Sequence, residues 1–392
     1  MPGDVLAPWR SALGKALAAL EQQHQRRTLA EIPGTDLCSN DYLGLATHPA
    51  LREALLRAVQ ESSRVGATAS RLLSGHTEAW RQLEDHFAAF AGAEAALFFS
   101  SGYAANLGLL SALVGPDDVV YSDALNHASL IDGMRLSGAR KVIYAHLDLG
   151  ALEKSLRQDS GAPWRRIIIT ESVFSMNGDV APLREMASLA DKFGAAIIVD
   201  EAHATGVHGP QGRGLAAGAG ILPQVLATIH TCGKALASAG AFVCGPAVLK
   251  DHLINHARTF IFSTALPPYF AGQIAAALNL AVSMDAERQA LLGRAAQFND
   301  TLRRAGFDTG ASASQIVPVI LGGNRDTVDA AEHLQKEGFA VRAIRPPTVP
   351  PGRSRLRLSL TTRISDHQLH TLASSLTNWR DTKRPRTATR YA

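Results

Sequence analysis

The stretch Ala196-Ile197-Ile198-Val199-Asp200-Glu201-Ala202-His203 decides the fold. Its apolar half runs without polar alternation into two acids and a histidine, which is typical of a strand buried on both faces of a parallel sheet. Four further apolar runs of this kind lie at residues 119–121, 142–144, 167–169 and 225–229, and a helical pattern occupies residues 183–193. This alternation of strand and helix predicts an α/β fold with a mostly parallel, doubly wound sheet.

The pattern changes near residue 285, where we expect a second, smaller domain. Apolar runs at 316–321 and 340–344, followed by the alternating Leu356, Leu358 and Leu360, predict a small sheet with one solvent-facing side. We therefore divide the chain into four parts. These are an N-terminal segment (1–45), a large domain (46–284), a small α+β domain (285–379) and a basic flexible tail (380–392).

Composition excludes several classes of protein. The 392 residues are 46% hydrophobic and 19% charged and include three widely separated cysteines, so disorder, a disulfide framework and a membrane-spanning segment are not expected. The amino terminus lacks the apolar core of a signal peptide, which favours a cytoplasmic protein. The net charge of +4 comes from residues 380–392, which hold five of the 39 basic residues and one of the 35 acidic residues. The rest of the chain is balanced, so no nucleic-acid partner is expected.

The polar residues that follow Val199 admit two interpretations. Ligand sites of open α/β sheets lie at the carboxyl ends of strands, which makes Asp200 and His203 candidate site residues. Residues 199–203 also match one half of the DEAH-type nucleotide hydrolase machinery. That machinery requires a GxxxxGK[ST] phosphate loop, and the Gly-Lys pairs at 14–15 and 233–234 lack its flanking residues. A nucleotide hydrolase is therefore kept only as an alternative of a different class.

Lys234 is the candidate nucleophile, because it follows the strand expected at 225–229. Its neighbours in the stretch 231–240 are mostly small and apolar. Burial among such neighbours lowers the pKa of a lysine and frees its amine for Schiff-base formation. Taken alone, a lysine that extends into solvent is the commoner arrangement.

Two other features precede plausible helices. The turn at 100–103 opens a helix whose free amides suit a phosphate, although an ordinary N-cap explains the same residues. His127 follows the strand expected at 119–121, a position where a structural histidine is commoner than a catalytic one. Together, an acid at one strand end, a lysine after a later strand, a histidine and a phosphate-type turn are the parts that a pyridoxal 5'-phosphate (PLP) site requires.

Five motifs, in this order, resemble the α-oxoamine synthase family of fold-type I PLP-dependent transferases. They are residues 39–45 (SNDYLGL), 126–129 (NHAS), 170–179 (TESVFSMNGD), 200–203 (DEAH) and the Gly-Lys pair at 233–234. Within the family, residues 343–350 (AIRPPTVP) and 355–358 (RLRL) resemble the members that condense L-alanine with a pimeloyl thioester in biotin biosynthesis. Those members release carbon dioxide and the thiol carrier, which is coenzyme A or a carrier protein.

The resemblance implies a role for each matching position. Lys234 would hold PLP covalently and later move the proton on the α-carbon of alanine. Asp200 would pair with the pyridine nitrogen, His203 would reach the ring hydroxyl, and His127 would stack on the ring. The implied phosphate ligands are the amides of Gly102 and Tyr103 and the hydroxyls of Ser175 and Thr231, together with Thr264, which each subunit of a homodimer lends to the other. The implied substrate-binding residues are Asn40, Arg345, Thr348 and Arg357, and no metal is implied.

Two points stay open in the sequence. The resemblance implies an arginine for the acyl chain at Arg26 or Arg27, and the short stretch at 29–37 does not decide between them. Glycine C-acetyltransferase, 5-aminolevulinate synthase and sphingolipid-type synthases carry the same cofactor motifs and stay alternatives.

Overall fold

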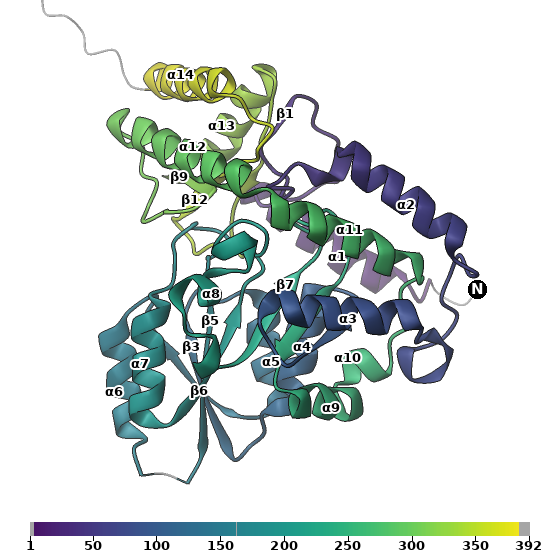
Figure 1. The fold of residues 1–392 in the computed structure, drawn as a ribbon. Helices are drawn as coiled ribbons and strands as arrows, with labels where there is room; N and C mark the ends of the chain where they lie inside the picture. Colours follow the sequence, from purple (N-terminus) through teal and green to yellow (C-terminus); the bar gives the residue numbers. More distant parts are fainter. Residues whose placement is uncertain (1–3, 162, 384–392) are drawn as a thin grey trace, which may run out of the picture.

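The computed structural model describes residues 4–161 and 163–383 (Figure 1). The helices are α1 (Ala7–Gln22), α2 (Pro49–Glu61), α3 (Glu78–Ala91), α4 (Gly102–Leu113), α5 (Ala128–Ser137), α6 (Leu149–Gln158), α7 (Leu183–Phe193), α8 (Leu215–Ala219), α9 (Ala247–His256), α10 (Arg258–Ile261), α11 (Tyr269–Ser283), α12 (Asp285–Arg304), α13 (Asn324–Lys336) and α14 (Asp366–Lys383). The strands are β1 (Thr35–Asp36), β2 (Ala95–Phe99), β3 (Asp118–Asp123), β4 (Arg140–Tyr144), β5 (Arg165–Glu171), β6 (Ala195–Asp200), β7 (Val225–Thr231), β8 (Ala241–Gly245), β9 (Ile316–Gly322), β10 (Phe339–Ala340), β11 (Ala343–Ile344) and β12 (Ser354–Ser359).

A seven-stranded sheet forms the centre of the large domain. Its order is β2-β8-β7-β6-β5-β3-β4, and every neighbouring pair is parallel except the two that include β8. Residues 196–200 lie in β6, which is the middle strand of this sheet. The prediction of a mostly parallel, doubly wound sheet is therefore confirmed.

Successive residues of β6 enter different hydrophobic cores. Ile198 packs in a core with residues of α4, α5 and α9, whereas Ile197 and Val199 pack in a core with residues of α6 and α7. Figure 1 shows these two groups of helices on opposite sides of the sheet. Because both faces are covered, the strands need no polar alternation, and this is why unbroken apolar runs identified them.

The small domain contains an antiparallel sheet of order β11-β12-β9. The expectation that one side of this sheet faces solvent is wrong. All residues of β12 are buried: Leu356 and Leu358 pack in the core, whereas Arg355 and Arg357 bond to the turn at 175–177 of the large domain. The polar half of the alternation therefore faces the other domain instead of water.

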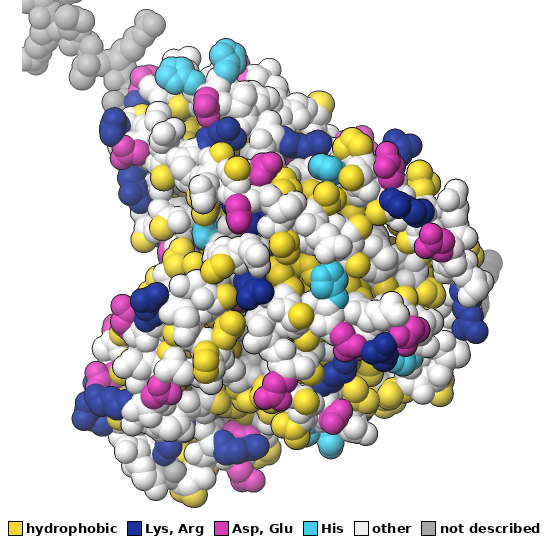
Figure 2. Space-filling model, viewed as in Figure 1, with side chains coloured by type: hydrophobic (Ala, Val, Ile, Leu, Met, Phe, Trp, Pro, Cys, Tyr) yellow, Lys and Arg dark blue, Asp and Glu magenta, His cyan; other side chains and the backbone are white. Residues whose placement is uncertain are grey.

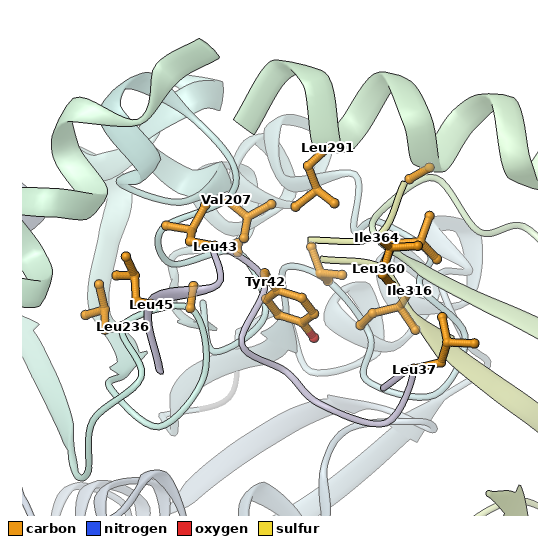
Figure 3. Close-up of a cluster of buried hydrophobic side chains, with 14 of the residues drawn as sticks. Leu37, Tyr42, Leu43, Leu45, Val207, Leu236, Leu291, Ile316, Leu360 and Ile364 are labelled. Carbon is orange, nitrogen blue, oxygen red and sulfur yellow. The ribbon is translucent and has the colours of Figure 1, made fainter. Parts of the chain in front are cut away.

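One hydrophobic core joins the N-terminal segment to both domains (Figure 3). Tyr42 of the N-terminal segment lies between Val207 of the large domain and Leu291, Ile316 and Leu360 of the small domain. This packing fixes the neighbouring Asn40 at the boundary of the two domains.

The C-terminal helix extends into the expected tail. Arg380 donates to the carbonyl of Ala305, and Lys383 Nζ lies 2.8 Å from a carboxylate oxygen of Asp329. Residues 380–383 therefore belong to α14, and residues 384–392 lie outside the described residues. The other domain limits stay predictions.

The chemistry of the surface and of the thiols agrees with the composition. Cys38, Cys232 and Cys244 are free. Within the described residues, no helix has the length and hydropathy to cross a bilayer. Figure 2 shows basic and acidic side chains intermixed on the viewed face, with hydrophobic side chains gathered over α2 and α11.

Candidate active site

The carboxyl ends of β5, β6 and β7 and the amino ends of α4 and α5 meet at one cavity of about 260 Å³. Parallel strands end at the same edge of a sheet, so residues far apart in the sequence come together there. The predicted site residues that line the cavity are Gly102, Tyr103, His127, Asp200, His203, Thr231 and Lys234.

A chain of hydrogen bonds leads from Lys234 to the N-terminal segment. Lys234 Nζ lies 2.9 Å from His203 Nε2, and His203 Nδ1 lies 2.7 Å from the Tyr42 hydroxyl, which donates to Asn40 Oδ1 over 3.0 Å. Because the amide oxygen of Asn40 only accepts, the Tyr42 oxygen is left to accept from His203 Nδ1–H. This tautomer leaves Nε2 as an acceptor for Lys234, so the lysine is bonded inside the protein and does not extend into solvent.

Burial controls the charge of these two groups. Burial lowers the pKa of Lys234 to about 8, although the nearby carboxylates of Asp200 and Glu171 oppose this. Burial, together with the positive charges of Lys234 and Arg357, lowers the pKa of His203 well below its ordinary value. His203 is therefore a neutral imidazole near pH 7, and an appreciable share of Lys234 is a free amine.

Asp200 is held rigidly at the end of β6. Its Oδ2 accepts from Asn106 Nδ2 over 2.7 Å, and its Oδ1 accepts from the amide of Ala202 over 2.9 Å. Asn106 also donates to Ser129 Oγ over 2.9 Å, and this hydroxyl lies 2.7 Å from His127 Nδ1. The acid and the predicted stacking histidine are thus connected through α4 and α5.

The start of α4 forms a cradle for an anion. Ser101 Oγ caps the helix by accepting from the amide of Ala104 over 3.1 Å, while Gly102 and Tyr103 line the cavity. A Cβ on Gly102 would lie 2.6 Å from Thr231 Cγ2, so only glycine allows the helix end and Thr231 to approach this closely. The amino end of a helix attracts a phosphate through its free amides and its dipole.

The charges of the cavity also fit PLP. Glu171 is buried, and its Oε1 has no hydrogen-bond partner within the described residues. Burial and the negative charge of Asp200 raise the pKa of Glu171 to about 8. Glu171 therefore holds its proton near pH 7, and the negative charge of Asp200 is the one that a protonated pyridine nitrogen would neutralise. The cradle, the held acid and the free lysine amine are thus suited to PLP.

Arg357 and Asn40, the two residues expected to bind the alanine carboxylate, contact each other at the domain boundary. Arg357 Nη2 donates to Asn40 Oδ1 over 3.0 Å, and Nη1 donates to Ser359 Oγ over 2.6 Å. Its Nε donates to the carbonyl of Ser175. These contacts hold the buried guanidinium of Arg357 near His203.

Several predicted residues lie outside the cavity. Thr264 pairs with Ser70 through an isolated β-bridge. Arg345 and Thr348 lie against the N-terminal segment, where Arg27 Nη2 lies 3.2 Å from the carbonyl of Pro346 and 3.4 Å from Thr348 Oγ1. The structure therefore brings Arg27 to this group. Arg26 instead pairs with Glu21 on the surface.

Sequence reasoning gave no role to four residues of the site, namely Tyr42, Asn106, Ser129 and Glu171. Three of them lie inside or next to quoted motifs. Asn106 carried a usable signal, because it falls four residues after Gly102 and therefore on the same face of a helix.

Comparison with known proteins shows the family of the chain. The family model of class I and II aminotransferases matches residues 32–376. The 8-amino-7-oxononanoate synthase of Geotalea daltonii is 46% identical over 364 residues, covering 91% of this chain and 92% of that protein. The synthase of the same name from Citrifermentans bemidjiense is 48% identical over 326 residues, covering 83% of each.

Solved structures show the same fold. Sphingomonas wittichii serine palmitoyltransferase superposes with a TM-score of 0.87 at 30% identity, covering 97% of this chain and 99% of that one. The 8-amino-7-oxononanoate synthase of Francisella tularensis gives a TM-score of 0.77 at 28% identity, covering 89% and 98%. A serine palmitoyltransferase from S. paucimobilis with bound PLP gives 0.87 at 27% identity, covering 97% and 99%.

Proposed function

This chain belongs to the class I and II aminotransferases and, within them, to the 8-amino-7-oxononanoate synthases, and from this premise we propose the reaction of its own site. The chain is a PLP-dependent acyltransferase that joins L-alanine to the pimeloyl group of a thioester in biotin biosynthesis. Carbon dioxide and the thiol carrier leave. The observation that carries the assignment to this site is the contact of the Lys234 amine with neutral His203 in a cavity that Asp200 also lines.

Bound PLP supplies an electron-poor ring that accepts the electron pair left when a bond to the α-carbon of the amino acid breaks. Lys234 would provide the amine that attaches the cofactor and, as a free amine, the base that takes the α-proton of alanine. A pKa of about 8 keeps both its charged and its neutral form populated near pH 7, as both tasks require.

The remaining residues bind, orient and exclude water. Asp200, fixed by Asn106 and the Ala202 amide, would pair with the ring nitrogen, and the cradle at Gly102 and Thr231 would hold the phosphate. Arg357 and Asn40 bind the carboxylate of alanine, since a guanidinium fork matches a planar anion. Arg357 is buried between the domains, which limits the access of water to the reacting carbon.

The proposed function is tested by measuring which amino acid the protein condenses with pimeloyl-CoA. We expect the PLP-loaded protein to release carbon dioxide and coenzyme A in equal amounts from L-alanine and pimeloyl-CoA. Glycine or L-serine should replace alanine poorly. Faster condensation with glycine or serine would assign the chain to a related synthase instead. Replacing pimeloyl-CoA by the pimeloyl thioester of a carrier protein identifies the preferred donor.

We assign the far carboxylate of the pimeloyl group to the cluster of Arg27, Arg345 and Thr348. Burial and the nearby positive charge of Arg27 lower the pKa of Arg345, so the two cations repel each other here. An anion between them would relieve this repulsion. The contacts of Arg27 with residues 345–348 therefore favour Arg27 over Arg26.

Replacing this arginine tests the assignment. We expect Arg27→Ala to raise the KM for pimeloyl-CoA by about 10- to 100-fold, because a hydrogen bond to a charged group contributes about 1.5–3 kcal/mol. The KM for alanine should not change. Arg26→Ala is the matched control and should behave as wild type. Heptanoyl-CoA lacks the far carboxylate, so Arg27→Ala and Arg26→Ala should use it equally well. A larger rise of the KM for pimeloyl-CoA in Arg26→Ala than in Arg27→Ala would reverse the assignment.

We also propose a homodimer that shares its active sites. Thr264, the predicted phosphate ligand, lies outside the cavity of its own chain. Helix α1 exposes Trp9, Leu13 and Leu17 at helical spacing, and no residue of this helix is buried. An apolar stripe of this size is typical of a surface that a second subunit covers.

Breaking this stripe should separate the subunits. We expect the triple change Trp9→Ser, Leu13→Ser and Leu17→Ser to weaken dimerisation by at least about 100-fold, since each buried side chain contributes about 1.5–3 kcal/mol. Sedimentation velocity at micromolar protein measures the change. Ile143→Thr, which alters an exposed apolar residue on edge strand β4, should leave the dimer intact. If the triple variant dimerises as strongly as wild type, α1 is ruled out as the contact.

A further inference from the structure

Three charged side chains outside the cavity form a linear cluster. His146 Nδ1 lies 2.8 Å from Asp123 Oδ1, and His146 Nε2 lies 2.7 Å from Asp179 Oδ2. The Asp123 carboxylate is fully buried at the end of β3, and the Asp179 carboxylate is nearly so. The edge of the His146 ring also packs on Phe174, with 4.5 Å between ring centroids.

The geometry fixes the charge of the histidine. A neutral imidazole carries one N–H, so it donates to only one of two carboxylates. Both ring nitrogens of His146 face carboxylate oxygens at hydrogen-bond distance. An imidazolium satisfies both contacts, and it leaves the cluster with one net negative charge.

The cluster holds the turn at 173–180 of the large domain, and this turn contacts the small domain. Asp179 belongs to this turn, and Asn177 donates to Asp179 Oδ2 over 3.2 Å. The Ser175 carbonyl accepts from Arg357 Nε, and Asn177 Oδ1 accepts from Arg355. The position of the turn therefore decides where the Arg357 guanidinium points.

Gly178 leaves the turn little freedom on its other side. Its φ of +70° suits glycine, and a Cβ there would lie 2.0 Å from the carbonyl oxygen of Ile316. The turn is thus clamped between the small domain and the Asp123–His146–Asp179 cluster.

We propose that His146 is a positioning residue: as an imidazolium between Asp123 and Asp179, it holds the turn at 173–180 so that Arg357 binds the carboxylate of the amino-acid substrate. The proposal rests on the proposed function only for the identity of that substrate. It assigns to His146 no contact with substrate or PLP.

The cluster makes this support depend on pH. The charged groups that face it are Asp123 on β3, Asp179 on the turn and Arg355 on β12. Burial lowers the pKa of Arg355, and the negative charge of Asp179 opposes this. Tyr144 on β4 lies near Asp123. Burial lowers the pKa of His146, but the bonds to Asp123 and Asp179 outweigh burial and raise it to about 9. A raised pKa means that the stabilisation is complete below about pH 6.5 and is lost as the pH rises through about 9.

The direct test compares alanine binding by His146→Gln and wild-type holoenzyme across pH. We expect the variant to bind alanine about 10- to 100-fold more weakly at pH 7, because small displacements of a binding group have effects of this size. The ratio of the two dissociation constants should approach one above pH 10, where wild type has lost the imidazolium. Taking the ratio cancels groups that titrate in both proteins. His367→Gln, an exposed change on α14, is the matched control and should show a ratio of one throughout.

A ratio of one at pH 7, or a raised ratio that does not change with pH, would overturn the proposal. If wild type itself binds no alanine, the proposed function fails, and the inference is then judged on the cofactor-free protein. There the unfolding midpoint of wild type should exceed that of His146→Gln at pH 7, and the difference should vanish above pH 10. Equal midpoints at pH 7 would also count against the cluster.

A measurement on wild type covers the case in which His146→Gln does not fold. Carbon NMR of ring-labelled histidines should show that one of the 14 histidines stays protonated until about pH 9. In Asp179→Asn this midpoint should fall by one unit or more, and alanine should bind more weakly. Neutral rings at all positions by pH 8, or an unchanged midpoint in Asp179→Asn, would refute the imidazolium.

Discussion

Replacing Lys234 by alanine is expected to lower the condensation of alanine with pimeloyl-CoA by about 10⁴-fold, the upper end of what a positioned proton-transfer group contributes. The change removes both the amine that attaches PLP and the base for the α-proton. Within the described residues, His203 is the group bonded to this amine, and its pKa is already well below its ordinary value. A neutral, buried imidazole that accepts from the lysine is a poor substitute as a base.

The measurement has two parts. Turnover is compared in wild type, Lys234→Ala and Lys192→Ala, the last being an exposed lysine on α7 that pairs with Glu153 and should keep full activity. Borohydride reduction of wild type followed by peptide mapping should place the PLP label on Lys234. Substantial activity in Lys234→Ala, or a label on another lysine, would contradict the assignment.

The large sheet was predictable because its signal is local. Ile197, Ile198 and Val199 face two covered sides, so their burial needs no partner to be known in advance. The placement of Asp200 followed from the same strand, since parallel strands place their carboxyl ends at one edge. Lys234, His127 and Gly102 were individually ambiguous, and only their combination indicated a PLP site.

The small sheet was misjudged because its partner is distant in the sequence. The alternation in β12 indicates that its two faces differ, but it does not distinguish water from another domain. Arg355 and Arg357 bond to residues 175–177, nearly two hundred positions earlier. A contact of this kind leaves no periodic trace in either segment.

The site residues that the sequence did not predict show the same limit in another form. Asn106 acts by holding Asp200, and Glu171 is a buried acid whose pKa depends on the negative charge of Asp200 beside it. Such roles exist only once the fold has placed the groups a few ångströms apart. Motif reading finds residues that touch a cofactor more easily than residues that hold those residues in place.

The other large effect is expected at Asp200. Asp200→Asn keeps the size and an acceptor oxygen for Asn106 but removes the negative charge that faces the ring nitrogen. Removing one partner of a buried charge pair costs about 3–5 kcal/mol, so turnover should fall by about two to four orders of magnitude, with weaker PLP binding. Asp251→Asn, the same change at an exposed position on α9, should have no effect.

A cofactor analogue separates this pairing from simple damage to the fold. In an analogue with carbon in place of the ring nitrogen, the partner of Asp200 is missing, so wild type should lose nearly as much turnover as Asp200→Asn does with PLP. Combining the variant with the analogue should then add little, because the two changes remove one interaction. Losses that multiply would show that Asp200 acts elsewhere.

Asp200 also raises the pKa of Glu171, so in Asp200→Asn the pKa of Glu171 should fall from about 8 toward its ordinary range. The pH dependence of PLP binding near pH 8 should weaken accordingly, which ties the charge on Asp200 to that on its buried neighbour.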